Sequence, residues 1–190
     1  MIEEVHKANE IIGRLTTQIE TLEKDSNLDA LTKVFNRRAL SKYLQNICEQ
    51  KNFHHELHLL ILDIDDFKNI NDEHGHIAGD KILIFIANIL KKTLRDGDKI
   101  FRYGGEEFIV ILNRIDMSHC LKIATRILEL ISRNKLIYQG KSLSVTASMG
   151  TTIFEQNDTP DSFIARADKA LYKAKEEGKN RVHSELADGN

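Results

Sequence analysis

The stretch DKIFRYGGEEFIVIL, residues 98–112, holds two apolar runs on either side of a glycine pair. Both runs are long enough to be strands, and Gly104 and Gly105 suit the positive-φ positions of a tight turn, so the stretch predicts a β-hairpin. Glu106 and Glu107 follow the glycines directly. Carboxylates are depleted in strands, so this is either a turn with a solvated edge or a place where the acids serve chemistry.

The segments around the hairpin alternate between strand-like and helix-like patterns. LHLLILDID (57–65) is a continuous apolar run typical of a buried strand, SLSVTASMGTTIF (142–154) has a period near two, and NRVHSE (180–185) adds a short edge strand. Helical spacing covers 31–50, 79–94, 116–134 and 161–178, and 67–75 is a short helix or loop. The mixture predicts an α/β fold with a central mixed, largely antiparallel sheet flanked by helices, related to the ferredoxin-like plan.

The first residues of the chain follow a different pattern. Apolar residues alternate spacings of three and four, as in a heptad seam: Val5, Ala8, Ile12, Leu15, Ile19 and Leu22. We therefore predict a parallel coiled-coil helix over 1–27 that pairs two copies, a globular domain over 28–185 and a disordered tail over 186–190. The alternative for 1–27 is an amphipathic helix packed on its own domain.

Composition excludes several classes of protein. The formal net charge of the 190 residues is -2, so no global basic field favours nucleic acid. Cys48 and Cys120 lie in apolar helical contexts, which is typical of unpaired thiols in a reducing compartment, and we predict a cytoplasmic protein. The sequence shows no signal peptide, and no window approaches the roughly 18 apolar residues of a membrane span.

Acids also stand at the end of the strand 57–65. A carboxylate at the end of a buried strand is costly unless it is paired or bound to metal, and Asp63 directly follows Leu62. If the hairpin pairs with this strand, Asp63 and the glutamates lie side by side. Oxygen ligands without His or Cys favour Mg²⁺ or Mn²⁺, which predicts phosphoryl or nucleotidyl transfer. The alternative is a solvated strand end.

Cationic and backbone groups that suit phosphate lie nearby in the sequence. The turn after the strand, with Asp66, Phe67 and Lys68, offers backbone N–H groups at a helix start. Lys175 and Lys179 lie near the end of the last helical segment. For these two lysines the alternative is a solvated basic helix face.

Four motifs together resemble the GGDEF-domain diguanylate cyclases, in the GGEEF version. They are DALTKVFNRR (29–38), DIDDFKNINDEHGHIAGD (63–80), RYGGEEF (102–108) and ADKALYKAKEEGKNRV (167–182), and the resemblance covers about residues 26–185. It implies a fold shared with nucleotide cyclases and polymerase palm domains. It also implies condensation of two GTP molecules into cyclic di-GMP with release of two pyrophosphates.

The resemblance assigns roles to individual residues. Asp63, Glu106, Glu107 and the backbone carbonyl of Ile64 would hold two Mg²⁺ (or Mn²⁺) ions per active site, with Glu106 promoting deprotonation of the 3′-hydroxyl. The remaining substrate contacts would be guanine at Asn71 and Asp80, and phosphates at Asp66, Phe67, Lys68, Lys175 and Lys179. Lys179 replaces the usual arginine of the family, which keeps the charge but loses the bidentate fork.

The resemblance also implies an inhibitory site for the product. Its RxxD signature is RDGD, with Arg95 and Asp98, and Arg126 on the following helix matches a partner arginine. By itself the pattern more often describes a surface ion pair. Since each domain would hold one GTP, the resemblance implies a homodimer controlled by a sensory domain or partner. The alternative function is a catalytically silent module that binds cyclic di-GMP or GTP.

Overall fold

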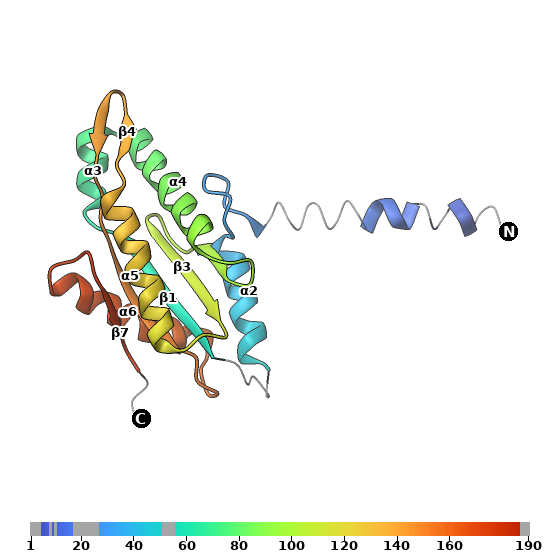
Figure 1. The fold of residues 1–190 in the computed structure, drawn as a ribbon. Coiled ribbons are helices and arrows are strands. Elements are labelled where there is room, and N and C mark those ends of the chain that lie inside the picture. Colours follow the sequence, from blue (N-terminus) through green and yellow to red (C-terminus); the bar gives the residue numbers. More distant parts are fainter. Residues whose placement is uncertain (1–4, 8, 10, 17–26, 51–55, 187–190) are drawn as a thin grey trace.

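The computed structural model describes residues 5–7, 9, 11–16, 27–50 and 56–186. A five-stranded sheet in the order β2-β3-β1-β6-β7 forms the centre of the domain, with helices on both faces (Figure 1). Its strands are β1 (Leu57–Ile64), β2 (Lys99–Arg102), β3 (Glu107–Asn113), β6 (Ala147–Ile153) and β7 (Val182–Ser184). β1 runs antiparallel to β3 and β6, β2 antiparallel to β3, and β7 parallel to β6. The predicted mixed, largely antiparallel sheet is therefore confirmed.

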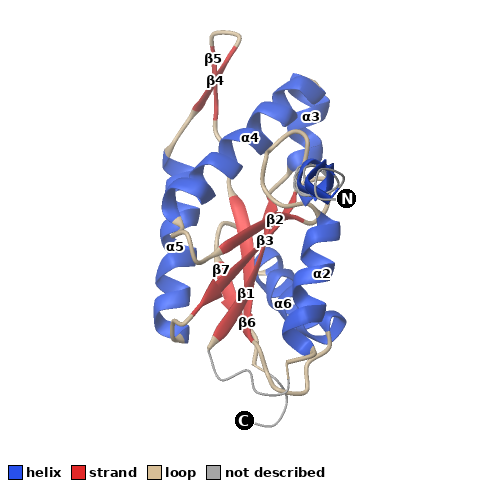
Figure 2. Ribbon diagram, turned by 90° about the vertical axis from the view of Figure 1, so that its right-hand side faces the viewer, coloured by secondary structure: helices blue, strands red, loops and turns tan. Residues whose placement is uncertain are grey.

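The helices cover the two faces of this sheet (Figure 2). Their bounds are α2 (Arg37–Cys48), α3 (Phe67–His74), α4 (His76–Thr93), α5 (Met117–Arg133) and α6 (Pro160–Glu176). Leu60, Leu62 and Ile64 of β1 join one core with residues of α4 and α5. Leu59 and Ile61 join a second core with residues of α2 and α6. Every residue of β1 is buried because each face carries a helical layer.

Side-chain caps fix where the helices begin. Asn36 accepts a hydrogen bond from the Ala39 N–H at 3.0 Å and starts α2, which is why the helix does not extend back to residue 31 as predicted. Thr159 and Ser162 form a capping box ahead of α6, with Pro160 in its first turn. The start of α6 therefore agrees with the sequence prediction.

The predicted strand 142–154 is shorter in the structure. Residues Lys141–Leu143 form β5, which pairs only with β4 (Leu136–Tyr138) in a separate two-stranded sheet. Gln139 and Gly140, with φ of 49° and 75°, make the tight turn of this hairpin. The alternating pattern runs through both strands, and periodicity alone does not reveal the break between them. The hairpin projects beyond the sheet in Figure 2.

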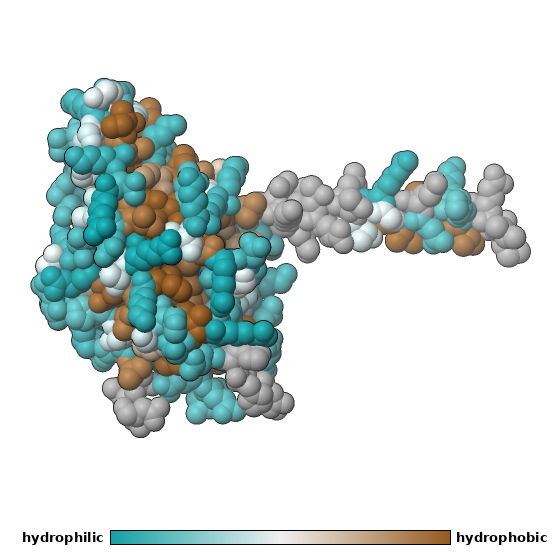
Figure 3. Space-filling view, viewed as in Figure 1, coloured by the Kyte–Doolittle hydropathy of each residue, from teal (hydrophilic) through white to brown (hydrophobic). Residues whose placement is uncertain are grey.

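The N-terminal residues that the structure describes, 5–7, 9 and 11–16, are helical. Val5, Ile12 and Leu15 expose 58%, 60% and 51% of their surface, and Figure 3 shows apolar side chains along one side of this helix. Ala8, Ile19 and Leu22 of the predicted seam lie outside the described residues, so the coiled coil and the three segment boundaries stay predictions.

Among the helices within the described ranges, none combines the length and apolar character needed to cross a membrane.

Candidate active site

The sheet brings the predicted acids together. In the antiparallel pair of β1 and β3, Asp63 lies directly opposite Glu107. Residues directly opposite on antiparallel strands have Cβ atoms about 5 Å apart. Glu106 immediately precedes β3. The expectation that the hairpin pairs with the first strand is confirmed, and this pairing forms the candidate site.

The glycine pair has a different role from the one predicted. The loop closes through hydrogen bonds from the N–H groups of Tyr103 (2.9 Å) and Gly104 (3.3 Å) to the carbonyl of Glu107. Neither Gly104 nor Gly105 has a positive φ, so that part of the prediction is wrong. The Glu107 carboxylate instead lies over Gly104, where a Cβ atom would collide with it. Gly104 thus makes room for an acid.

Lys175 supplies the positive charge next to the acids. Its Nζ lies 2.9 Å from Asp63 Oδ1, and the Asp63 side chain is only 11% exposed. Burial raises the pKa of Asp63, Glu106 and Glu107, and the Asp63 charge raises the pKa of both glutamates further. Lys175 lowers each of these pKa values. One ammonium therefore compensates the group only in part.

The donor chemistry of these acids fits a hard divalent cation. Their oxygens are the ligands Mg²⁺ and Mn²⁺ prefer, and burial, followed by repulsion from neighbouring acids, raises their pKa values. No three His, Cys, Asp or Glu side chains within the described ranges already surround a common point. One oxygen of Asp63, Oδ1, lies 2.9 Å from Lys175 Nζ.

Two of the predicted phosphate residues, Lys179 and Asp66, are paired with each other. Lys179 Nζ lies 2.6 Å from Asp66 Oδ1. Both residues have left-handed backbones, with φ of 62° and 55°. Phe67 is buried at the start of α3, whereas Lys68 is exposed beside it. The structure thus gathers the turn after β1 and the end of α6 at one place.

The predicted guanine contacts lie on consecutive helices. Asn71 belongs to α3 and Asp80 to α4, and Gly75 joins the two helices with a φ of 82°. Asn71 Oδ1 is buried without a hydrogen-bond partner. It contacts the Cα side of Gly79, where any larger residue would collide with it. The Asp80 carboxyl is on an exposed residue. The unpaired acceptor of Asn71 and the exposed carboxyl of Asp80 suit a ligand with several N–H donors.

Two residues of the predicted product site, Arg95 and Asp98, contact each other and the end of β3. Arg95 Nε lies 3.5 Å from Asp98 Oδ1, with the two side chains 57% and 3% exposed. Asp98 also accepts from the Asn113 N–H at 3.4 Å, and Arg95 Nη2 donates to the Asn113 carbonyl. Arg126 is exposed on α5. In the described part of the chain no hydrogen bond or ion pair joins Arg126 to Arg95 or Asp98.

Three residues near the acids were given no role from the sequence. Asp168 on α6 raises the pKa of Asp63 and Glu107. Arg37 lowers the pKa of Glu107, and its guanidinium lies 4.8 Å from the centre of the Tyr103 ring. The third is Asp65, whose contacts are described below. Asp168 stands seven positions before Lys175, about two helical turns, and this spacing on one helix face was the available signal.

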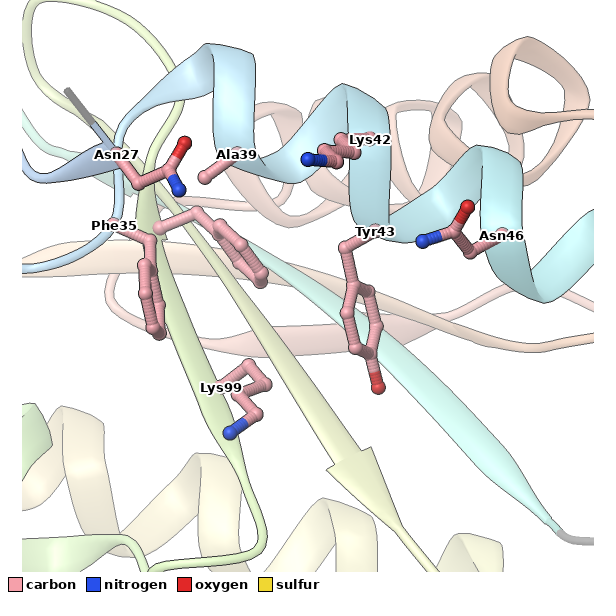
Figure 4. A pocket seen from close by; sticks show the side chains of 8 residues that line it. Asn27, Phe35, Ala39, Lys42, Tyr43, Asn46 and Lys99 are labelled. Atoms are coloured by element: carbon pink, nitrogen blue, oxygen red, sulfur yellow. The ribbon is translucent and has the colours of Figure 1, made fainter. Parts of the chain in front are cut away.

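A hollow of about 250 Å³ lies between α2 and β2, away from these acids (Figure 4). Phe35, Tyr43 and Phe101 line it together with Lys42, Lys99, Asn27, Asn46 and Ala39. None of these residues belongs to the predicted site.

The comparison with known families assigns this fold to a class of protein. The family described as "Diguanylate cyclase, GGDEF domain" matches residues 26–181. The chain belongs to the GGDEF family.

Several relatives carry names of the same kind. The chain is 38% identical over 183 residues to "Diguanylate cyclase DgcP" of Pseudomonas aeruginosa, covering 96% of this chain and 27% of that protein. It is 42% identical over 144 residues to "Diguanylate cyclase A" of Treponema denticola, covering 75% of this chain and 39% of that protein. The chain therefore spans well under half the length of these relatives.

Solved structures share the fold over nearly the whole chain. The coiled coil and GGDEF domain of DgcB from Caulobacter crescentus, solved in complex with c-di-GMP, matches with a TM-score of 0.86 and 29% identity, over 95% of this chain and 97% of that one. Diguanylate cyclase SiaD from Pseudomonas aeruginosa, solved with its activator SiaC, matches with a TM-score of 0.83 and 31% identity, over 96% and 71%.

Proposed function

We propose that this chain is a diguanylate cyclase that condenses two GTP molecules into cyclic di-GMP and two pyrophosphates. One observation carries the proposal: Asp63 faces Glu107 across paired central strands, with Glu106 beside them and the Lys175 ammonium 2.9 Å from Asp63. Such a cluster suits the developing negative charge of nucleotidyl transfer only with added cations. Membership of the GGDEF family supports the same activity.

In the proposed reaction the chain's acids and turns divide the work. Asp63, Glu106, Glu107 and the Ile64 carbonyl would hold two Mg²⁺ or Mn²⁺ ions, which would supply positive charge to the triphosphate and lower the pKa of the ribose hydroxyl. Glu106 takes the proton from the 3′-hydroxyl, and its raised pKa suits a proton acceptor. The 3′-oxygen then forms a bond to the α-phosphorus of the other GTP, and the bond to the β-phosphate oxygen breaks.

The remaining predicted residues bind the ends of GTP. Asn71 and Asp80 accept hydrogen bonds from the guanine edge, which discriminates against purines without those donors. Asp66, Phe67 and Lys68 border the phosphates. Lys175 and Lys179, now paired with acids, turn to the β- and γ-phosphates when GTP binds.

Two domains must face each other, because each binds one GTP and the 3′-oxygen of each GTP attacks the α-phosphorus of the other. We propose a homodimer held by the N-terminal helix, whose exposed apolar residues support a coiled coil. A sensory domain or partner would act through that helix, and the reaction would take place in the cytoplasm. Arg95, Asp98 and Arg126 would bind the product as an inhibitor, and the large exposed fraction of Arg95 suits this role.

The central test is incubation with GTP and Mg²⁺ followed by chromatography of the products. The chain should form cyclic di-GMP, and Glu106→Ala should form none. Glu129→Ala, an exposed acid on α5, is the matched control and should keep the wild-type rate. No product from a folded dimer would refute the proposal in favour of the silent binding module.

Two further measurements test the dimer and the inhibitory site. Specific activity should fall on dilution from micromolar to nanomolar concentration as protomers separate. Full activity of a chain that sediments as a monomer would refute the dimer.

Arg95→Ala should relieve inhibition by added cyclic di-GMP without abolishing synthesis. Unchanged inhibition would exclude this product site.

A further inference from the structure

Asp65 is a buried acid that the proposed reaction leaves unused. It lies two residues after Asp63, just beyond the end of β1, and only 5% of its surface is exposed. Its own N–H donates to the Thr146 carbonyl at 2.9 Å. Since a buried carboxylate is costly unless its oxygens are satisfied, its partners show what its place in the fold requires.

The Asp65 carboxylate joins three segments that are distant in the sequence. Oδ2 accepts from Thr146 Oγ1 at 2.7 Å and from the Asn180 N–H at 3.2 Å. Oδ1 accepts from Ser148 Oγ at 2.7 Å. Ser148 Oγ in turn accepts from the same Asn180 N–H at 3.1 Å. Asp65 and β6 thus hold one backbone amide of the turn after α6.

That turn has an unusual backbone. Gly178, Lys179 and Asn180 have φ values of 113°, 62° and 49° in succession. Left-handed residues other than glycine persist only when their surroundings hold them. The Lys179 N–H bonds back to the Ala174 carbonyl of α6 at 3.0 Å, and the Asn180 N–H bonds forward to Asp65. Asp65 therefore anchors the side of the turn that faces the sheet.

The anchored turn carries Lys179, which points at Asp66. Lys179 Nζ lies 2.6 Å from the Asp66 carboxylate, and Asp66 follows Asp65 directly. Lys175, one turn earlier in the chain, reaches Asp63. The three acids of 63–66 thus have different partners. Asp63 and Asp66 face the ammonium groups of Lys175 and Lys179, whereas Asp65 accepts from the backbone of the turn that carries Lys179.

We propose that Asp65 is a positioning residue that sets the left-handed turn 178–180 and thereby aims Lys179 at the terminal phosphates of a nucleoside triphosphate. The inference rests on the proposed function for the identity of the ligand. Asp65 does not itself touch the substrate. Its removal should weaken recognition of the β- and γ-phosphates and leave recognition of the base unchanged, because the base contacts lie on α3 and α4.

The first experiment needs no nucleotide. Amide hydrogen exchange measured by NMR should show Asn180 exchanging about tenfold faster in Asp65→Ala, while amides of β1 and β3 keep their protection. Asp65→Asn should restore most of the protection, because its amide oxygen still accepts from Asn180 and hydroxyl groups accept or donate as needed. Asp161→Ala, an exposed acid at the far end of α6, is the control. Unchanged exchange at Asn180 in Asp65→Ala would overturn the proposal.

The second experiment compares calorimetric binding of GMP with that of an α,β-methylene analogue of GTP, which cannot release pyrophosphate. Asp65→Ala should lower affinity for the triphosphate about tenfold and change affinity for GMP less than about twofold. Lys179→Ala should match it, and the double variant should lose no more than either single one. Additive losses, equal losses for both nucleotides, or a wild type that binds both equally would overturn the proposal. A wild type that shows the expected binding pattern without making cyclic di-GMP would instead refute only the proposed function.

Discussion

Replacing Lys175 by Met should destabilise the domain in a pH-dependent way. Lys175 Nζ lies 2.9 Å from Asp63 Oδ1, and the side chains are 37% and 11% exposed. At this separation Coulomb's law gives about 1.4 kcal/mol with the dielectric constant of water and about 6 kcal/mol with an effective constant of 20. Because the lysine is more than a third exposed, the energy of the ion pair lies near the value for water. We therefore expect the free energy of unfolding to fall by about 1–2 kcal/mol at pH 7.

The pH dependence follows from the neighbouring acids. Burial raises the pKa of Asp63, Glu106 and Glu107, and Lys175 opposes the rise in each. A carboxyl group with a raised pKa in the folded state contributes stability that is complete below its unfolded pKa of about 4. That contribution is lost as the pH rises through the folded pKa. Without Lys175 the folded pKa values rise further, so the variant should match wild type near pH 4 and fall behind it towards pH 7.

The assay is urea unfolding followed by circular dichroism at several pH values between 4 and 7, in buffer free of divalent cations. Lys169→Met is the matched control on α6, because its partner Glu185 keeps a second ion pair with Lys173, and we expect a change below about 0.5 kcal/mol. A difference between Lys175→Met and wild type that is the same at pH 4 and pH 7 would refute the reasoning. So would no difference at pH 7.

Three other substitutions have definite expected outcomes. Gly150→Ala should lower the free energy of unfolding by about 1–3 kcal/mol in urea, because the added Cβ meets the backbone of Ala167 and Leu171 in α6; an unchanged midpoint would contradict this. Glu106→Gln should abolish cyclic di-GMP synthesis yet not lower stability in divalent-free buffer, since it removes a charge that the Asp63 carboxylate repels; a loss above about 1 kcal/mol would count against it. Arg166→Ala should cost about 3 kcal/mol, because it leaves Asp158 buried without its bidentate partner, while calorimetry should show unchanged GTP affinity.

The sequence was informative where side-chain periodicity and cross-strand pairing decide the structure. The continuous apolar run of β1 predicted a buried strand, and pairing of the hairpin with that strand was expected to bring Asp63 close to Glu106 and Glu107. The register that sets Asp63 opposite Glu107 follows from which residues must be buried. The fold class and the proximity of these acids could therefore be predicted from the sequence.

Other features depend on tertiary contacts that leave little trace in the sequence. The glycine pair suggested positive φ, but Gly104 instead lies against the Glu107 carboxylate, a contact that only the folded loop reveals. Asp65 was only one of the acids at the strand end in the sequence, and its partners Thr146, Ser148 and Asn180 lie more than 80 positions away. The break between β5 and β6 was hidden because both segments alternate with the same period.

The central place of β1 has a consequence for biosynthesis. Leu62 of β1 is flanked by Phe108 of β3 on one side and by Met149 of β6 on the other. During synthesis from the N-terminus, this apolar strand must wait until β6 has left the ribosome before its second edge is paired. Open apolar edges invite pairing with other chains. Fragments that end before β6 should therefore aggregate, and a nascent chain should depend on chaperones until most of the domain has been translated.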